Sequence, residues 1–299
     1  MANKFQRAFS LRFRRIITNS ADGTPPWIDL VSAGDDLGYF KPTDAPWVVH
    51  GDIATLIGGI RALLMQALHP GSLAGVADHS RYEKDPLGRL AGTTRWLTIL
   101  TFGATDAISQ ESARVNGMHK KVVGTYSDSA GQEVDYAAAN SDLLLWVHAA
   151  FTESFLVTNE VFGVKEIPGG SDEYVRLWAR AVQPLGLTNA PLSKIDLTNA
   201  IHSFDSVLRS DAVTLRVVEF IKHPPLSFSA RIAYTLLFQA AAVTIEPKYL
   251  KILGLRPTPS FLVIPAARIL LKLMRLALGG ISPLEEAALA RHRRVKGEL

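Results

Sequence analysis

The sequence predicts an all-α fold, arranged as a single-domain helical bundle. Apolar residues recur at helical spacing through most of the 299 residues, whereas strand-like stretches are sparse and do not alternate with helices as a doubly wound sheet requires. No linker, repeat or shift in composition divides the chain, and 47% hydrophobic residues suffice for one large core. We therefore expect residues 1–299 to form one domain.

The hydrophobic pattern predicts the following helices in chain order. Helices are expected over 52–69, 95–102, 110–124, 142–162, 171–183, 197–222, 229–242, 261–278 and 283–294. Pro70 is expected to stop the first helix, Gly124 to stop the third, and Ser171 to cap the fifth. Between residues 125 and 135, the run Ser-Asp-Ser-Ala-Gly predicts the turn of a small hairpin.

The chain contains no cysteine, which limits the chemistry that its site can perform and fits a reducing compartment. The absence of cysteine excludes disulfides, iron–sulfur clusters, thiolate-ligated haem and a cysteine nucleophile. The first 18 residues lack the uninterrupted apolar core of a secretory signal, and no uncharged apolar run has the length of a membrane-spanning helix. We therefore expect a cytoplasmic protein, with peripheral membrane contact as an option.

Positive charge is concentrated at the two ends of the chain. The net charge is +4, but a basic N-terminal arm over residues 1–20 opens with five basic and no acidic residues in its first 15. A nucleic-acid-binding protein would carry a broad basic surface, so nucleic acid is not an expected partner. Solvated tails are the favoured interpretation of these ends, and contact with a membrane surface is the alternative.

The familiar catalytic motifs are missing. There is no glycine-rich nucleotide loop, no nucleophile elbow, no His-Glu-x-x-His and no paired Glu-x-x-His of a di-iron bundle. The chemical inventory is therefore the eight histidines and the charged residues that interrupt apolar helices.

Two histidines stand inside apolar helical stripes. His119 lies one turn from Val115, and His148 lies between Leu144 and Phe151 at the same spacing. Each is either a neutral core histidine bonded to a carbonyl group or the ligand of a buried cofactor. A haem needs an apolar slot between helices, one neutral imidazole and basic groups for its propionates, and this chain carries all three.

Further candidates lie between residues 61 and 95. Arg61 interrupts an apolar helix and needs a buried partner, for which Asp52, Asp78 and a cofactor propionate are open alternatives. His69 begins a stretch of small and polar residues that either shapes a pocket or only stops a helix. Arg89 either meets a carboxylate in a two-pronged contact or is a surface arginine.

Residues 48–160 carry a series of motifs in a specific order. They are Gly51-Asp52, the run from Gly59 to Pro70, Gly75 to Ser80, Asp85-Pro86 with Arg89 and Thr93, Phe102-Gly103, Arg114 to His119, Val122 to Gly124, Tyr136, and Leu144 to His148. This order resembles the catalytic domain shared by rubber oxygenase (latex-clearing protein) and the mpaB oxygenases of the mycophenolic-acid type. The resemblance is strong over 48–160 and loose over the rest of the chain.

The resemblance implies a globin-like helical core around haem b. His119 falls on the family's iron ligand, while Arg89 and Thr93 fall beside the haem. At the position before Thr93, where rubber oxygenase can carry a distal lysine, this chain has Gly92. His148 falls in the pocket region, with acid–base, supporting and packing roles all open for it.

The predicted site therefore has two overlapping parts. The cofactor-binding set is Arg61, His69, Arg89, Thr93 and His119, with His119 as the metal ligand. The catalytic set is Arg89, Thr93 and His148.

The implied activity is oxidation by O₂, since the two best-known members cleave carbon–carbon double bonds of isoprenoid chains. We expect a haem-b-dependent oxygenase that acts on a small apolar or prenylated substrate. The alternatives are a haem dehydrogenase that oxidises without cleavage and a non-catalytic haem or lipid carrier. The expected partners are the substrate and O₂, with a homodimer as an option.

The segment 261–278 carries one further signal. Arg268, Lys272 and Arg275 share a helical face, and most apolar side chains lie elsewhere on the helix. Such a helix either rests on a membrane surface or packs on the core at the periphery of the fold, and the second interpretation is favoured.

Overall fold

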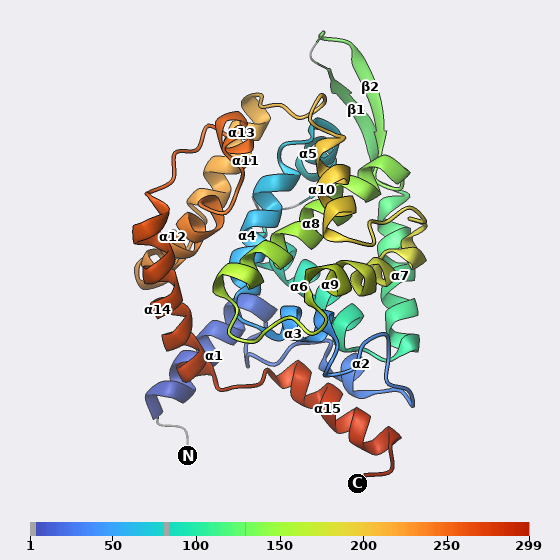
Figure 1. Cartoon of the computed structure of the whole chain (residues 1–299), viewed down its shortest axis with the longest axis vertical. Helices are drawn as coiled ribbons and strands as arrows, with labels where there is room; N and C mark the ends of the chain where they lie inside the picture. Colours follow the sequence, from blue (N-terminus) through green and yellow to red (C-terminus); the bar gives the residue numbers. More distant parts are fainter. Residues whose placement is uncertain (1–3, 81–83, 129, 299) are drawn as a thin grey trace.

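The computed structural model describes residues 4–80, 84–128 and 130–298 as helices around a common core, with one hairpin (Figure 1). The elements are α1 (Lys4–Thr18), α2 (Ile28–Ser32), α3 (Ala45–Gly51), α4 (Thr55–Gln66), α5 (Pro70–His79), α6 (Pro86–Phe102), α7 (Thr105–His119), β1 (Val123–Ser127), β2 (Glu133–Ala137), α8 (Ser141–Phe162), α9 (Gly170–Trp178), the 3₁₀ turns η1 (Ala179–Ala181) and η2 (Gln183–Leu185), α10 (Lys194–His202), α11 (Ala212–Lys222), α12 (Phe228–Ala242), α13 (Pro247–Ile252), α14 (Ser260–Leu278) and α15 (Pro283–Val295). The predicted all-α class is confirmed, and the globin-like arrangement stays a prediction.

Helices α4 and α8 form the centre of the bundle. They pack along each other, while α12 and α11 cover α4 and α10, α9 and α14 cover α8. The centre of α8 is buried on nearly every side, including Trp146, Phe155 and Phe162. A helix that is apolar all round requires neighbours all round, so α8 becomes the axis of the fold.

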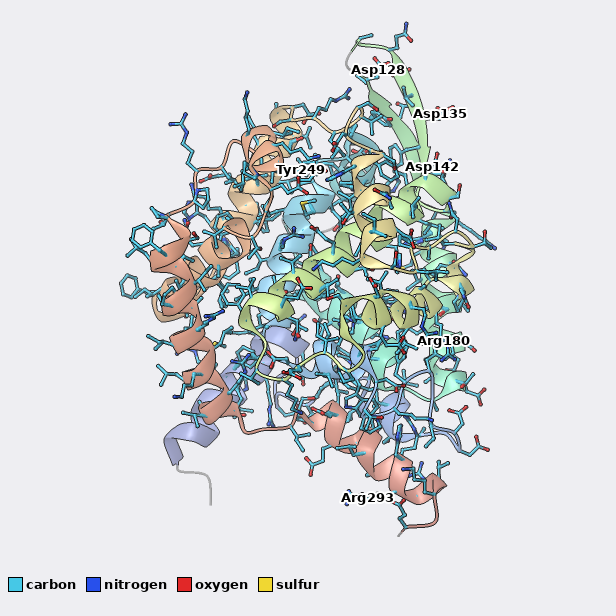
Figure 2. All side chains as sticks on the ribbon, in the orientation of Figure 1. Asp128, Asp135, Asp142, Arg180, Tyr249 and Arg293 are labelled. Carbon is cyan, nitrogen blue, oxygen red and sulfur yellow. The ribbon has the colours of Figure 1, made fainter. Side chains whose placement is uncertain are left out.

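The hairpin projects from the helical body, as the sequence predicts. In Figure 2 its turn carries Asp128 and its second strand Asp135, which is paired with Thr125 across an antiparallel ladder. Asp128 Oδ1 accepts hydrogen bonds from the backbone N–H groups of Ala130 and Gln132, at 2.8 and 2.9 Å, and this bridge sets the turn.

Several predicted helix boundaries are wrong. The second predicted helix begins at Pro86 rather than at 95, and the third begins at Thr105 rather than at 110. Three further differences have a local reason. Pro70 does not end a helical region: it is the first residue of α5, where a proline lacks only an N–H that would be unpaired anyway. The stretch expected as a helix over 110–124 ends at His119, because Gly124 lies in β1. The stretch expected over 197–222 divides into α10 and α11, because Asp211 starts a new helix with a reciprocal capping box.

The fifth predicted helix is also shorter than expected. Helix α9 ends at Trp178 and continues as η1 and η2 up to Leu185. Ser171 lies inside α9, and the N-cap position belongs to Gly169 in a left-handed conformation.

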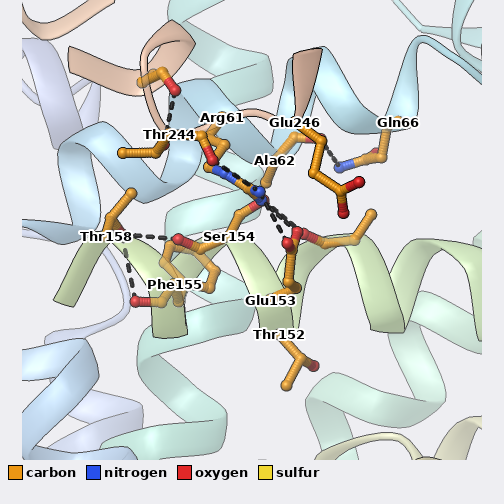
Figure 3. A network of polar contacts seen from close by, with 12 residues as sticks. Arg61, Ala62, Gln66, Thr152, Glu153, Ser154, Phe155, Thr158, Thr244 and Glu246 are labelled. Atoms are coloured by element: carbon orange, nitrogen blue, oxygen red, sulfur yellow. Dashed lines mark hydrogen bonds and ion pairs between the residues drawn. The ribbon is translucent and has the colours of Figure 1, made fainter. Parts of the chain in front are cut away.

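A buried ion pair joins the two central helices. The Arg61 side chain on α4 is 1% exposed, and its Nη atoms donate to the two carboxylate oxygens of Glu153 on α8 at 2.5 and 2.9 Å. Ser154 Oγ and the Thr244 carbonyl oxygen accept two further bonds, at 2.8 and 3.3 Å, as Figure 3 shows. The partner of Arg61 is therefore Glu153; Asp52 is paired with Arg275 instead.

Membrane-spanning potential is limited in the described ranges. No single helix there is both long and apolar enough to cross a membrane. Only α3 and α4 taken together meet the criteria of length and composition, and they meet at a bend of 94°.

Replacing Glu153 by Gln leaves the Arg61 guanidinium buried without a counter-charge. We expect the free energy of unfolding, measured by urea denaturation at pH 7, to fall by about 3 kcal/mol. The matched control is Glu173→Gln, which removes the exposed pair of Glu173 with Arg176 and costs under about 1 kcal/mol. Equal losses in the two variants would contradict a central role for the buried pair.

Candidate functional site

Helices α6 and α7 form an antiparallel hairpin that brings distant residues together. Only Gly103 and Ala104 separate the two helices. The Arg95 Nε atom on α6 donates to Glu111 Oε2 on α7 at 2.9 Å, which fixes how the helices align. Continuing from that pair toward the start of α6 and the end of α7 leads to Arg89 and His119.

Arg89 and Thr93 lie one helical turn apart near the start of α6. Asp85 caps this helix by accepting the Gly88 N–H at 2.9 Å, and Pro86 occupies its first turn. Arg89 Nη1 donates to Thr93 Oγ1 at 2.5 Å, and the hydroxyl lies 3.3 Å from the Arg89 carbonyl oxygen, to which it donates. The contact holds the guanidinium along the helix.

Arg89 lacks a counter-charge within the described part of the chain. No carboxylate there makes an ion pair with it, although burial lowers the pKa of its guanidinium. A desolvated cation is stabilised strongly by an anion that approaches it, and a guanidinium binds a carboxylate through two parallel hydrogen bonds. Arg89 is therefore a candidate for binding a carboxylate that is not part of the described chain.

His119 is the last residue of α7 and carries a neutral imidazole. Burial, and then the nearby positive charge of Arg89, lower its pKa. Its Nδ1 atom is buried and has no hydrogen-bond partner among the described residues. A neutral imidazole with a free nitrogen is the form that binds a metal ion.

Space adjoins this cluster at Gly92. A Cβ atom built on that residue would meet no atom within 4 Å, although the residue itself is half-buried. The position lies one residue before Thr93 and one turn after Gly88, on the same half of α6 as Arg89. The chain therefore leaves room next to Thr93, which a longer side chain at position 92 would fill.

Glu111 holds the hairpin at mid-length. Its carboxylate is buried between Arg95 and Arg114, with contacts of 2.9 Å and 2.5 Å. Burial opposes ionisation, but the bonds to both arginines outweigh it and the pKa of Glu111 is lowered. The charged carboxylate keeps Arg95 and Arg114 paired, which leaves Arg89 as the unpaired cation of the hairpin among the residues described.

His148 lies apart from this cluster in terms of hydrogen bonds. It is buried in α8, and burial lowers its pKa to about 4. Its Nε2 atom is 3.5 Å from Thr152 Oγ1, whose hydroxyl donates a much shorter bond to the His148 carbonyl oxygen, at 2.7 Å. None of the hydrogen bonds and ion pairs between described residues joins His148 to Arg89, Thr93 or His119.

His69 and Arg61 have structural partners of their own. His69 is the N-cap of α5 and accepts the Ser72 N–H on Nδ1 at 3.3 Å, while its ring lies against Trp146 and Phe204. Burial lowers the pKa of His69 to about 4. With Arg61 held by Glu153, neither residue shares a hydrogen bond or ion pair with the Arg89 cluster in the described structure, and their predicted role toward a cofactor stays a prediction.

Sequence reasoning missed Glu153 and Glu111, and a signal was present for Glu153. Glu153 is a carboxylate within an apolar stretch of helix, as Arg61 is a cation within one, whereas Glu111 lies among polar residues of α7. Isolated charges of opposite sign in buried helices must pair, so matching them would have indicated the Arg61–Glu153 contact.

The cluster fits a haem. A neutral histidine with an unpartnered buried nitrogen suits a ligand to iron, an unpaired, half-buried arginine suits a propionate, and Gly92 leaves open space on the half of α6 that carries Arg89. Groups of three or more His, Asp or Glu side chains that could hold a bare metal ion are absent among the described residues. A haem needs only one such ligand, so His119 and Arg89 are the residues that would hold it.

Comparison with known proteins gives one family. The family described as ER-bound oxygenase mpaB/B′/rubber oxygenase, catalytic domain, matches residues 47–277, which include Arg61, His69, Arg89, His119 and His148. Neither the curated proteins nor the solved structures gave a match.

Replacing Arg89 by Gln tests the electrostatic contact within the hairpin. Burial is the larger cause of the lowered His119 pKa, and the Arg89 charge adds to it, so we expect the pKa of His119 in Arg89→Gln to rise part of the way toward its ordinary value of 6.5. The shift is measured by following the imidazole protons by NMR against pH in the ligand-free protein. The same titration in Arg180→Gln is the control, and an unchanged His119 pKa in Arg89→Gln would contradict the contact.

Replacing His148 by Gln tests burial of a neutral imidazole. The folded-state pKa of about 4 lies below the ordinary 6.5, so the unfolded chain takes up the proton first as pH falls. Stability is therefore retained above pH 6.5 and lost as pH falls toward 4. Between pH 7 and pH 5 we expect the free energy of unfolding to fall by about 2 kcal/mol less in His148→Gln than in the parent protein. In the control variant His223→Gln, which changes an exposed histidine, the free energy of unfolding should fall between pH 7 and pH 5 by as much as in the parent protein.

Proposed function

Because the chain belongs to the family of the mpaB/B′ and rubber oxygenase catalytic domains, it has oxidoreductase activity of the oxygenase type, and we propose that it is a haem-b-dependent oxygenase acting on a small apolar or prenylated substrate with O₂. The observation that carries the haem assignment is the pairing of His119 with Arg89. A neutral imidazole and an uncompensated guanidinium lie together within the matched segment, and iron and a propionate are what these two groups would bind.

Each residue of the cluster has a distinct part in the proposal. Bound haem would supply an iron atom that activates O₂. His119 would hold the iron through a ring nitrogen, and its low pKa keeps that nitrogen free of a proton at neutral pH. Arg89 would bind a propionate, and the hydrogen bond from its Nη1 atom to Thr93 would orient it.

Thr93 and Gly92 would shape the space that the substrate and O₂ enter. The Thr93 hydroxyl donates at present only a 3.3 Å bond to a carbonyl oxygen of its own helix, so it can turn to donate to oxygen. Gly92 presents no side chain there, which leaves room for an apolar substrate.

The proposed reaction balances without an outside reductant. When O₂ cleaves a carbon–carbon double bond into two carbonyl compounds, both oxygen atoms and all electrons end in the products. The chain therefore needs to exclude water and hold the two reactants rather than deliver electrons. His148, buried and neutral, is proposed as a supporting residue of the apolar surroundings.

The test is the absorption spectrum of the purified protein after expression with haem supplied. We expect a Soret band at about one haem per chain that shifts on reduction and on addition of CO, because haem iron held by a histidine of the protein binds CO once it is reduced. His119→Ala should lose the band or change its position, while the exposed His223→Ala should keep both.

Two results would overturn the assignment. The absence of a band, with no binding of added haemin, would exclude the haem proposal. An unchanged spectrum in His119→Ala would exclude His119 as the ligand. Labelling with ¹⁸O₂ then separates the activities: label in a cleaved product supports the oxygenase, and an unlabelled desaturated product identifies a dehydrogenase instead.

A further inference from the structure

Three helices on one edge of the molecule contain no acidic residue. Helices α1, α12 and α14 have 15, 15 and 19 residues, and they carry five, one and three basic residues but no Asp or Glu. Helix α14 packs against both of the others, and Figure 1 shows the three along the same side of the bundle. Since the whole chain has 28 acidic residues, this edge is an electrostatically distinct surface.

The outward side of this edge is apolar. Phe228 and Phe261 are 78% and 74% exposed, and five aliphatic side chains on the same two helices are more than half exposed. We use the name outer face for six of these residues: Phe228 and Ile232 on α12, and Phe261, Leu262, Ile269 and Leu273 on α14. Exposed apolar side chains gathered on two packed helices are typical of an interaction site in a folded protein.

The basic residues of α14 divide between two tasks. Arg268 donates to the Val161 carbonyl oxygen at 2.9 Å, and Arg275 pairs with Asp52 at 2.6 Å, so both attach α14 to the body of the fold. The face that the sequence predicts for the three basic residues is thus directed in part toward the core. Lys272 is exposed between Ile269 and Leu273 and belongs to the outer face in position.

Helix α1 adds positive charge at the border of this face. Its residues fall within the basic arm over 1–20 that the sequence indicates, and they form a helix. The Arg12 Nη2 atom donates to Ser227 Oγ at 2.8 Å, and Ser227 is the residue directly before Phe228 in the sequence. Arg15 is exposed on the same helix. Basic side chains therefore lie next to exposed aromatic ones.

We propose that the outer face docks on the surface of an anionic lipid bilayer. Its apolar side chains would enter the boundary between headgroups and acyl chains, and Lys272, together with Arg12 and Arg15 of α1, would contact anionic headgroups. A second copy of the chain is a poorer occupant, because it would bring two acid-free, basic surfaces together. The inference uses no property of the haem site and stands or falls separately from the proposed oxygenase activity.

The test is co-flotation of the full chain with vesicles of phosphatidylcholine alone or with one-third phosphatidylserine. We expect binding to the anionic vesicles, weakened by salt, and little binding to the neutral ones. The double variant Phe228→Ser/Phe261→Ser should bind at least about tenfold more weakly because two aromatic side chains no longer enter the interface. Lys272→Glu should weaken binding roughly tenfold.

The matched controls remove equally exposed groups elsewhere. Leu192→Ser/Ile195→Ser takes away two exposed apolar side chains at the start of α10, and Lys41→Glu reverses an exposed charge. Both should bind as the parent does. The proposal is overturned if no variant or parent binds anionic vesicles, if the Phe228/Phe261 variant binds like its control, or if light scattering shows a dimer that this variant dissociates while vesicle binding is absent.

Discussion

The structure is organised by the high free-energy cost of burying positive charge without an acceptor. Arg61 meets this constraint with the carboxylate of Glu153, and the pair fixes α4 against α8. Arg291, fully buried on α15, meets it with three backbone carbonyl groups from α2, the loop after it and α6, and so holds the last helix on the body. Arg89 has only the hydroxyl of Thr93 within the described structure.

This unpaired charge accounts for two properties of the site at once. It would attract an anion, and together with burial, the larger cause, it lowers the pKa of His119, which keeps the imidazole available to a metal. An anion bound at Arg89 would neutralise the charge and make the imidazole more basic, and hence a stronger ligand. Binding of a propionate and ligation of iron would therefore reinforce each other, which is a physical reason for placing both groups on one helical hairpin.

The sequence predicts those parts of the fold that depend on local pattern. The helix at 142–162 agrees with α8 within one residue because its apolar stripe is long, and the hairpin follows from the turn around Asp128. Predictions fail where the same residue can stop one helix or start the next. Pro70 is such a residue, and the hydrogen bond that His69 Nδ1 accepts from the Ser72 N–H favours the start of α5 there.

The candidate site also has parts that the sequence predicts and parts that depend on packing. Arg89, Thr93 and His119 are identified by the order of motifs, but their proximity depends on the hairpin of α6 and α7. At a helical rise of about 1.5 Å per residue, Arg89 and His119 both lie about 21 Å from the short connection between α6 and α7. If the two helices are assumed to be antiparallel, the sequence alone therefore places these residues side by side. The contact of Arg61 with Glu153 joins segments about 90 residues apart. Only the packing of α4 on α8 selects that carboxylate.

The proposed lipid contact and the proposed reaction meet at α1. This helix packs against both α14, which carries most of the outer face, and α6, which carries Arg89 and Thr93. An apolar or prenylated molecule partitions into a bilayer, so its concentration near a docked enzyme exceeds that in water by the partition coefficient. An enzyme held at that surface would then need little binding affinity of its own for the apolar chain. Its site could use a small space such as that beside Gly92 to position the reacting bond.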